Sequence, residues 1–333
     1  MTSWMLTGGA GYIGSHILRE LRDQGYQTIV VDDLSTGLAE RVPQDVPLLE
    51  LNVTERQAVA QAMIDHDVAG VIHLAAKKAV GESMRQPSYY YRQNVVGLLE
   101  LLGAMSDAGV ERLIYSSSAA VYGEPHVGTV SEDDATVPLS PYGETKLAGE
   151  WLVRDEARAR GLGSDAMSFV NLRYFNVAGA GSKLLGDTSV ANLIPLVFRA
   201  LSDGVDPVIF GTDYPTPDGT CIRDYIHVVD LARAHVAAVN ACAAAGAGEV
   251  ASTYNVGRGS GSSVREVMDA VADVTGLALH PRAVARRPGD PAMLVAKADR
   301  IAAELGWTAQ LDLRTMVASA WEAWSGARRS TRS

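Results

Sequence analysis

Three glycines near the amino terminus constrain the fold more than any other feature of this chain. Gly8, Gly11 and Gly14 are spaced three residues apart, after the apolar run 4–6 and before the helical stretch 15–24. Glycines let a backbone turn tightly and approach a pyrophosphate, while the helix that follows offers free N–H groups and the positive end of its dipole. A second apolar run, 28–31, completes a βαβ unit of roughly 30 residues. The sequence therefore predicts a dinucleotide-binding turn at the start of a parallel sheet.

The alternation of strands and helices continues along the chain. Further apolar runs lie at 48–51, 70–74, 112–116 and 170–175. This alternation predicts an α/β fold with a doubly wound parallel sheet, the Rossmann arrangement. After about Gly179 the rhythm breaks, and loops rich in Gly, Pro and Asp appear. We expect a cofactor domain of residues 1–178 plus about 225–255, and a smaller mixed α/β substrate domain of residues 179–224 plus about 256–327.

An acidic residue ends the second predicted strand. Asp32 lies 18 residues beyond Gly14, where a carboxylate can bind the diol of the adenosine ribose. Because the same charge repels a 2′-phosphate, the sequence favours NAD over NADP. A helix-capping role is the alternative for Asp32, and a stronger one for its neighbour Asp33.

A tyrosine and a lysine one helical turn apart point to catalysis. Tyr142 and Lys146 are four residues apart, so on a helix they share one face. A free tyrosine titrates near pH ~10, and a nearby ammonium favours the phenolate and brings it toward general-base duty. Together with a dinucleotide, such a base indicates redox chemistry at a hydroxyl-bearing carbon.

Charge and cysteine content exclude several other classes of function. The 333 residues are 47% hydrophobic and 20% charged, which is ordinary for a globular protein. A net charge of −10 argues against nucleic acid or an anionic membrane as partner, but not against a small anion bound by local arginines. Cys221 and Cys242 give neither a disulfide framework nor metal-ligand spacing. Since no apolar stretch reaches the ~20 residues of a membrane span, we expect a cytoplasmic enzyme without a bound metal.

Several segments resemble a known enzyme family. The glycine spacing, Tyr142, Lys146 and an upstream serine are similar to the extended short-chain dehydrogenase/reductase family. Within it, the chain closely resembles the UDP-galactose 4-epimerases, and the similar segments are 79–83, 116–123, 172–176, 210–220 and 223–228. The resemblance covers nearly the whole chain. It implies bound NAD, a UDP-sugar substrate, interconversion of UDP-glucose and UDP-galactose, and a homodimer paired through helices near 87–109 and 142–160.

The resemblance also implies a role for each matching residue. Tyr142 is the implied base, Lys146 its electrostatic partner, and Ser118 a hydrogen-bond partner of the sugar 4-oxygen. The implied cofactor contacts are Gly8, Gly11, Tyr12, Ile13, Gly14, Asp32, Asp33, Asn52, Val53, Leu74, Ala75, Ala76, Lys78, Asn94, Ser116, Tyr142, Lys146 and Tyr174. The implied UDP-sugar contacts are Lys78, Ser118, Tyr142, Asn176, Asn192, Leu193, Phe210, Arg223, Tyr225, Arg287 and Asp290. The two arginines suit a diphosphate, although a surface salt bridge is the alternative for each.

The family's mechanism explains why the cofactor emerges unchanged. Phenolate Tyr142 takes the proton of the 4-hydroxyl while C4 passes a hydride to NAD. The 4-keto sugar then turns about its link to the anchored UDP, and the hydride returns to the opposite face. Related dehydratases and decarboxylases carry acids where this chain has Ala119 and Ala120, so the resemblance argues against those reactions.

Two alternatives remain open at this point. Lys183 lies in the loop 179–187, close in sequence to Asn176. In related uronate epimerases a basic residue about here meets the C6 carboxylate, so Lys183 is a candidate substrate contact and UDP-glucuronate an alternative substrate; a solvated loop lysine is the plainer interpretation. A non-catalytic dinucleotide sensor is the remote alternative, although such proteins tend to lose the Tyr142 and Lys146 pair.

Overall fold

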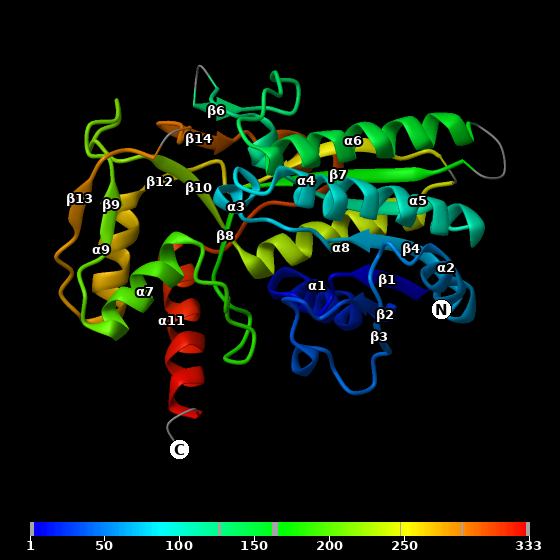
Figure 1. The fold of residues 1–333 in the computed structure, drawn as a ribbon, viewed down its shortest axis with the longest axis horizontal. Coiled ribbons are helices and arrows are strands. Elements are labelled where there is room, and N and C mark those ends of the chain that lie inside the picture. The colour runs from blue at the N-terminus through cyan, green and yellow to red at the C-terminus, as the bar shows by residue number, and fades with distance from the viewer. Residues whose placement is uncertain (1–2, 126–127, 162–165, 247, 288, 331–333) are drawn as a thin grey trace.

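A seven-stranded parallel sheet forms the larger part of the molecule (Figure 1). The structure is a computed structural model that describes residues 3–125, 128–161, 166–246, 248–287 and 289–330, with side chains as far as residue 326. The strands of this sheet are β1 (Ser3–Thr7), β2 (Gln27–Asp32), β3 (Leu48–Glu50), β4 (Val68–His73), β5 (Arg112–Ser118), β7 (Ser168–Tyr174) and β11 (Ala251–Val256). Their order is β11-β7-β5-β4-β1-β2-β3, and all neighbours are parallel. Because the order runs outward in both directions from β1, the predicted doubly wound α/β fold is confirmed.

Two layers of helices cover this sheet. One layer contains α1 (Tyr12–Asp23) and α8 (Val228–Ala244), which pack against each other; the other contains α2 (Arg56–Asp65), α5 (Gly97–Asp107) and α6 (Pro141–Arg160). Since side chains alternate along a strand, Leu6 of β1 packs in the first layer and Met5 in the second. Burial on both faces explains why the strands are continuous apolar runs in the sequence. Short connecting elements are η1 (Ala39–Arg41), α3 (Val80–Ser83), α4 (Pro87–Tyr90), the π-helical turn η2 (Tyr91–Val96) and η3 (Ala119–Val121).

The second part of the molecule contains two smaller sheets (left in Figure 1). The five-stranded sheet consists of β6 (Thr129–Val130), β8 (Asn176–Ala178), β10 (Ile222–His227), β12 (Gly261–Ser263) and β14 (Met293–Ala296). A two-stranded sheet pairs β9 (Val208–Phe210) with β13 (Arg282–Val284). A separate apolar core joins α7 (Leu193–Asp203), α9 (Val264–Thr275) and α11 (Leu313–Ser330). No helix in the described part of the chain combines the length and the apolar character that crossing a membrane requires.

The chain crosses between the two parts more often than the sequence suggested. After β10, the chain re-enters the first part as α8 and β11, and β11 pairs with β7. The predicted boundaries put residues 176–178 and 225–227 in the cofactor domain, whereas β8 and β10 lie in the second sheet. The predicted substrate domain includes α10 (Asp299–Leu305), which packs against α8 and β11. Apolar patterning shows that a strand is buried but not which sheet it joins, so these differences were not visible in the sequence.

Helix α6 carries Tyr142 and Lys146 and packs against the sheet. Its amino terminus is capped by Ser140, whose hydroxyl accepts a hydrogen bond of 3.2 Å from the Gly143 N–H. One face of the helix is buried against β5 and β7. A Cβ atom added at Gly149 would lie 2.1 Å from the Tyr115 hydroxyl, so the missing side chain lets the helix approach β5.

Gly149→Ala should lower the free energy of unfolding by about 1–3 kcal/mol, because the added methyl group overpacks this contact. Helix propensity alone predicts the opposite sign, a gain of about 1 kcal/mol. Gly326→Ala in α11 is the matched control, since a Cβ there meets open space among the described residues. Denaturant unfolding measures both variants, and equal effects would contradict the close packing of α6 on β5.

Candidate active site

The glycine turn is compact in a way that side chains would prevent. Gly8 adopts a φ of +76°, which favours glycine. A Cβ at Gly14 would lie 2.4 Å from the Gly8 carbonyl oxygen, and one at Gly8 would lie 2.8 Å from the Ala75 nitrogen. Among the described residues, no side chain caps α1 at Gly11, so the first N–H groups of the helix are available to an anion. The turn therefore fits a pyrophosphate at the carboxyl ends of β1 and β4.

Asp32 is tied to this turn. It is buried at the end of β2, where its Oδ2 accepts from the Ala10 N–H at 3.0 Å and its Oδ1 from the Leu34 N–H at 2.9 Å. Burial raises the pKa of the Asp32 carboxyl, and the two backbone donors oppose that shift. Asp33 is exposed and bonds Ser35 and Asn52. Asp32 is thus the acid that lies against the dinucleotide turn, while Asp33 organises the surrounding loop.

A lysine that the sequence analysis passed over lies beside these carboxylates. Lys77 Nζ donates to Ser35 Oγ at 3.0 Å, and its charge acts on Asp32 and Asp33. The neighbouring Lys78, which was predicted to contact the ligands, is exposed and donates to Ser189 Oγ at 3.4 Å. Two adjacent lysines in a loop give the sequence no means of telling which one faces the acids.

Asn94 explains why Lys77 is held in place. Its Oδ1 accepts from the Lys77 N–H at 2.8 Å, and its Nδ2 donates to the Lys77 carbonyl and to Thr145 Oγ1, each at 3.0 Å. The buried Asn94 amide therefore ties the loop after β4 to helix α6. Asn94 was predicted as a cofactor contact, and the geometry shows it bonded to the protein.

The predicted catalytic residues lie together where β5 meets the start of α6. Tyr142 and Ser118 are buried, and their side chains interact. Ser118 Oγ accepts from the Ala120 N–H at 3.2 Å. Burial raises the pKa of Tyr142, and the interaction with Ser118 opposes that shift. Ser118 is thus placed to share a proton with Tyr142 and with an oxygen bound next to both.

The Lys146 ammonium is bound to strand β5. Its Nζ donates to the Ser116 carbonyl at 2.7 Å and lies 5.2 Å from the centre of the Tyr115 ring. We expected the ammonium beside the Tyr142 hydroxyl, with a lowered tyrosine pKa; burial instead raises that pKa. A buried ammonium must find acceptors, and the carbonyl at the end of β5 is within its reach. Burial lowers the pKa of Lys146 to about 8, and Glu150 opposes the shift.

Tyr174 and Ser116 complete this cluster from β7 and β5. Both side chains lie in the surroundings of Tyr142: Tyr174 interacts with Ser116 and with Tyr142. Ser116 Oγ also lies 3.3 Å from His235 Nε2 on α8. His235 carried no motif in the sequence, because its place behind Ser116 depends on how α8 packs on the sheet.

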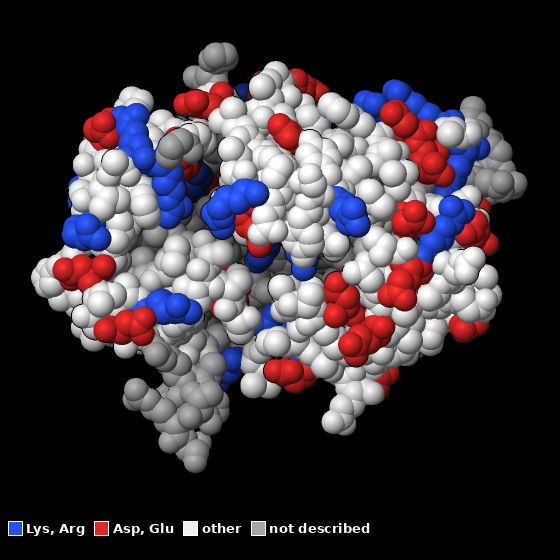
Figure 2. Space-filling model, in the orientation of Figure 1, with Lys and Arg blue, Asp and Glu red and all other residues white. Residues whose placement is uncertain are grey.

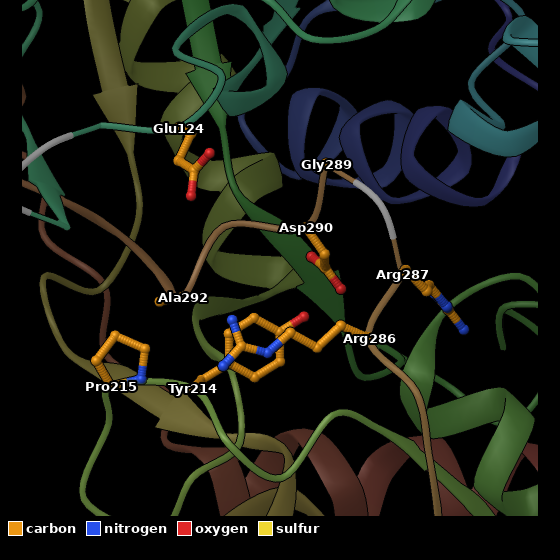
Figure 3. Close-up of a pocket in the computed structure, with 8 residues that line it drawn as sticks. All are labelled: Glu124, Tyr214, Pro215, Arg286, Arg287, Gly289, Asp290 and Ala292. Carbon is orange, nitrogen blue, oxygen red and sulfur yellow. The ribbon is translucent and has the colours of Figure 1, made fainter.

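The predicted nucleotide-binding residues meet at a cavity in the second part of the molecule. Arg223 forms an ion pair with Asp290, and the Arg287 guanidinium lies 3.8 Å from the centre of the Phe210 ring. Tyr225 is buried, which raises its pKa; the charge of Arg223 opposes this shift and that of Asp290 adds to it. The cavity has a volume of about 420 Å³ and is lined by Glu124, Tyr214, Pro215, Arg286, Arg287, Gly289, Asp290 and Ala292 (Figure 3).

Part of this lining was missed in the sequence. In Figure 3 Arg286 lies over Tyr214, with its guanidinium carbon 4.2 Å from the ring centre, while Arg287 extends to the opposite side. Glu124 faces the same cavity from the segment after η3. Figure 2 shows Lys and Arg side chains gathered around the hollow between the two parts of the molecule. A protein of net charge −10 thus offers local positive charge to an anion.

The remaining predicted contacts are distributed around the junction of the two parts. Asn176 is exposed at the start of β8, where it pairs in register with Tyr225. Asn192 precedes α7 and donates to Asp187 Oδ2 at 3.0 Å, and Leu193 begins that helix. Tyr12 uses its hydroxyl to donate to the Gly179 carbonyl at 2.6 Å. The others follow the strand ends or the glycine turn: Ile13, Asn52, Val53, Leu74, Ala75 and Ala76.

Lys183 is not turned toward this site. Its Nζ lies 3.1 Å from Glu322 Oε1 on α11, and the two side chains are 68% and 59% exposed. The predicted contact with a sugar carboxylate therefore has no support in the geometry. Because α11 is distant in sequence from the loop, this partner could not be predicted from local spacing.

Comparison with known proteins decides the family. A model described as the NAD dependent epimerase/dehydratase family matches residues 4–257. The chain belongs to this family. The UDP-glucose 4-epimerase of Azospirillum brasilense is 46% identical over 325 residues, which cover 96% of this chain and 91% of that protein.

Solved structures of family members agree. A UDP-glucose-4-epimerase from Stenotrophomonas maltophila, with bound NAD and formylated UDP-arabinopyranose, is 38% identical with a TM-score of 0.93, covering 99% of this chain and 100% of that one. MoeE5, in complex with UDP-glucuronic acid and NAD, is 33% identical with a TM-score of 0.81, covering 98% and 99%. The predicted resemblance and the predicted NAD cofactor are confirmed at the level of the family.

Denaturing the purified protein should release NAD as the main nucleotide, with NADP a minor species at most. The reason is Asp32, whose charge repels a 2′-phosphate at the ribose. Chromatography of the released nucleotide measures the ratio. Asp32→Asn should raise the share of NADP. Asp33→Asn is the matched control, since Asp33 is exposed and bonds its own loop. Recovery mainly of NADP would contradict the role of Asp32.

Proposed function

We propose that this protein is an NAD-dependent isomerase that interconverts UDP-glucose and UDP-galactose through a 4-keto intermediate. The observation that carries the proposal is the buried cluster of Tyr142, Ser118 and Lys146 at the end of β5, in the same molecule as a dinucleotide turn. The identity of 46% to a UDP-glucose 4-epimerase over most of both chains supports it.

NAD bound at the glycine turn supplies a hydride acceptor that later becomes the hydride donor. Gly8, Gly11 and Gly14 with the start of α1 hold its pyrophosphate, and Asp32 its adenosine ribose. As phenolate, Tyr142 takes the proton of the sugar 4-hydroxyl and returns it after inversion. Ser118 hydrogen-bonds the same sugar oxygen. Lys146 supplies positive charge that favours the phenolate, offsetting the cost of burying it.

The second part of the molecule holds the nucleotide half of the substrate. Arg223 and Arg287 bind the diphosphate, because guanidinium groups match phosphate oxygens in pairs. Asp290 accepts hydrogen bonds from the uridine ribose, and Phe210 and Tyr225 pack beside it. An anchored UDP with few polar partners around the sugar lets the 4-keto ring turn and present its other face.

The organisation of the protein follows from the same proposal. We assign the seven-stranded sheet and its helices to an NAD domain, and the five-stranded sheet with α7, α9 and α11 to a UDP-sugar domain. We also propose a homodimer through α5, η2 and α6, supported by exposed apolar side chains there: Tyr91, Val96, Leu99 and Trp151. Contiguous exposed apolar surface favours association. A cytoplasmic location is supported by Cys221 and Cys242, which are both free and buried.

The two alternatives are weaker than before. The uronate hypothesis rested on Lys183, which is paired with Glu322; its remaining support is the similarity to MoeE5, which was solved with UDP-glucuronic acid and NAD. The sensor hypothesis expects loss of the catalytic cluster, whereas Tyr142, Ser118 and Lys146 are all in place.

Tyr142→Phe should reduce kcat by about 10²–10⁴-fold, because it removes the base and leaves the ring that packs there. KM and UDP binding should stay near wild type. A coupled assay at saturating UDP-galactose measures kcat, and calorimetry measures UDP binding. Tyr91→Phe is the control, since that hydroxyl is exposed and bonds Glu144. A kcat near wild type would contradict the assignment of the base.

Lys183→Ala should leave the KM for UDP-glucose and for UDP-glucuronate unchanged within about twofold, since an exposed ion pair contributes little. Glu322→Ala removes the same pair from the other side and should behave alike. Side-by-side kinetics on the two substrates measure this. A selective rise in KM for UDP-glucuronate in the lysine variant would restore the uronate hypothesis.

A further inference from the structure

A buried ion pair lies directly behind the catalytic residues. Glu150 follows Lys146 by four residues on α6, so the two share one helix face. Its carboxylate accepts from Arg173 on β7, with Oε1 2.8 Å from Nε and Oε2 2.6 Å from Nη2. Ser117 Oγ on β5 also donates to Oε1. The Glu150 and Arg173 side chains are 6% and 8% exposed.

The pair is held by a complete hydrogen-bond network. Arg173 Nη1 donates to the Tyr122 hydroxyl at 2.9 Å and to the Glu132 carbonyl at 3.2 Å. The Tyr122 hydroxyl donates in turn to Asn255 Oδ1 on β11 at 2.7 Å. The Glu150 carboxylate therefore has a fixed position relative to β5, β7 and β11.

Stability alone does not explain this pair. Taking two charges out of water costs several kcal/mol per ion, and well-packed apolar side chains are often as stable or more so. We therefore expect these two buried charges to have a role in addition to packing. The next residue on the same helix face is Lys146, whose ammonium is also buried.

The surroundings of Lys146 contain several titratable side chains. They are His73 on β4, Tyr115 on β5, Tyr142 and Glu150 on α6, and, behind Ser116, Tyr174 on β7 and His235 on α8.

Most of these groups are neutral near neutral pH. Burial lowers the pKa of His73 to about 3, with Lys146 adding to the shift, and burial lowers that of His235 to about 4. Burial likewise raises the pKa of Tyr115, Tyr142 and Tyr174. Among the described groups in this set, Glu150 supplies the negative charge that opposes the desolvation of Lys146.

We propose that Glu150 is a positioning residue for Lys146: its carboxylate, fixed by Arg173 and Ser117, keeps the buried ammonium protonated so that it supports phenolate Tyr142. This rests on the proposed epimerase function. Glu150 touches neither substrate nor cofactor in this account, and acts through Lys146.

The sign of the expected effect follows from the charges. The pKa of Lys146 is lowered by burial to about 8, and Glu150 raises it. Without the carboxylate, the lysine pKa falls further, so the ammonium is lost at a lower pH. The alkaline limb of the pH profile of kcat/KM should therefore move to lower pH, while the rate below that limb is largely kept.

The experiment compares the pH profile of kcat/KM for the holoenzyme and three variants on UDP-galactose. Glu150→Gln removes the charge but leaves Arg173 unpaired, which is costly in a buried site. The double variant Glu150→Gln/Arg173→Met removes both charges and keeps the core neutral. Arg173→Lys disturbs the same packing while leaving Glu150 ionised.

Glu150→Gln should shift the alkaline limb to lower pH. The double variant should shift it in the same direction but by less, because it also removes the positive charge of Arg173. Arg173→Lys should keep the limb at the wild-type pH, whatever its effect on kcat. An unmoved limb in folded Glu150→Gln would assign the pair to structure alone and overturn the proposal, as would an equal shift in Arg173→Lys. Absence of epimerisation by the wild type would instead refute the proposed function, so the two failures are distinguishable.

Discussion

The contact between helix α6 and strand β5 positions the chemistry of this protein. Gly149 has no side chain where the Tyr115 hydroxyl approaches, so the helix lies close to the sheet. That closeness brings Lys146 to the Ser116 carbonyl and Tyr142 to Ser118. A helix farther away would leave the ammonium without an acceptor and the tyrosine without its serine. The glycine turn at β1 lies on the same carboxyl edge of the sheet, as doubly wound folds require of their ligand sites.

Buried charge is balanced separately in the two parts of the molecule. In the part of the molecule with the seven-stranded sheet, Glu150 and Arg173 form a pair on the helix that carries Lys146, and Asp32 is stabilised by backbone N–H groups. At the cavity in the second part, Arg223 pairs with Asp290, and Arg287 lies over an aromatic ring. These local arrangements allow an acidic protein to hold an anionic substrate at one end and a tunable base at the other.

Much of the fold was visible in the sequence, because it rests on local patterns. Apolar runs predicted six of the seven strands of the first sheet, all except β11, with ends within two residues of those in the structure. The less regular half was harder. Strand β10 looks like a strand of the first sheet but pairs with β8, β12 and β14. Which sheet a buried strand joins depends on strands far away in the chain. The periodicity of apolar residues does not identify those strands.

The sequence by itself determined the chemical inventory and the residues that local spacing places together: the glycine turn, Asp32 at a strand end, and Tyr142 with Lys146 on one helix face. Tertiary structure alone decided where the charges point. Lys146 binds the end of β5, and Lys77 rather than Lys78 lies beside the acids. Lys183 pairs with Glu322, and Glu150 is buried against Arg173. The physical reason is that a long charged side chain can reach acceptors several ångströms apart. Which acceptor lies within its reach depends on elements that are distant in sequence.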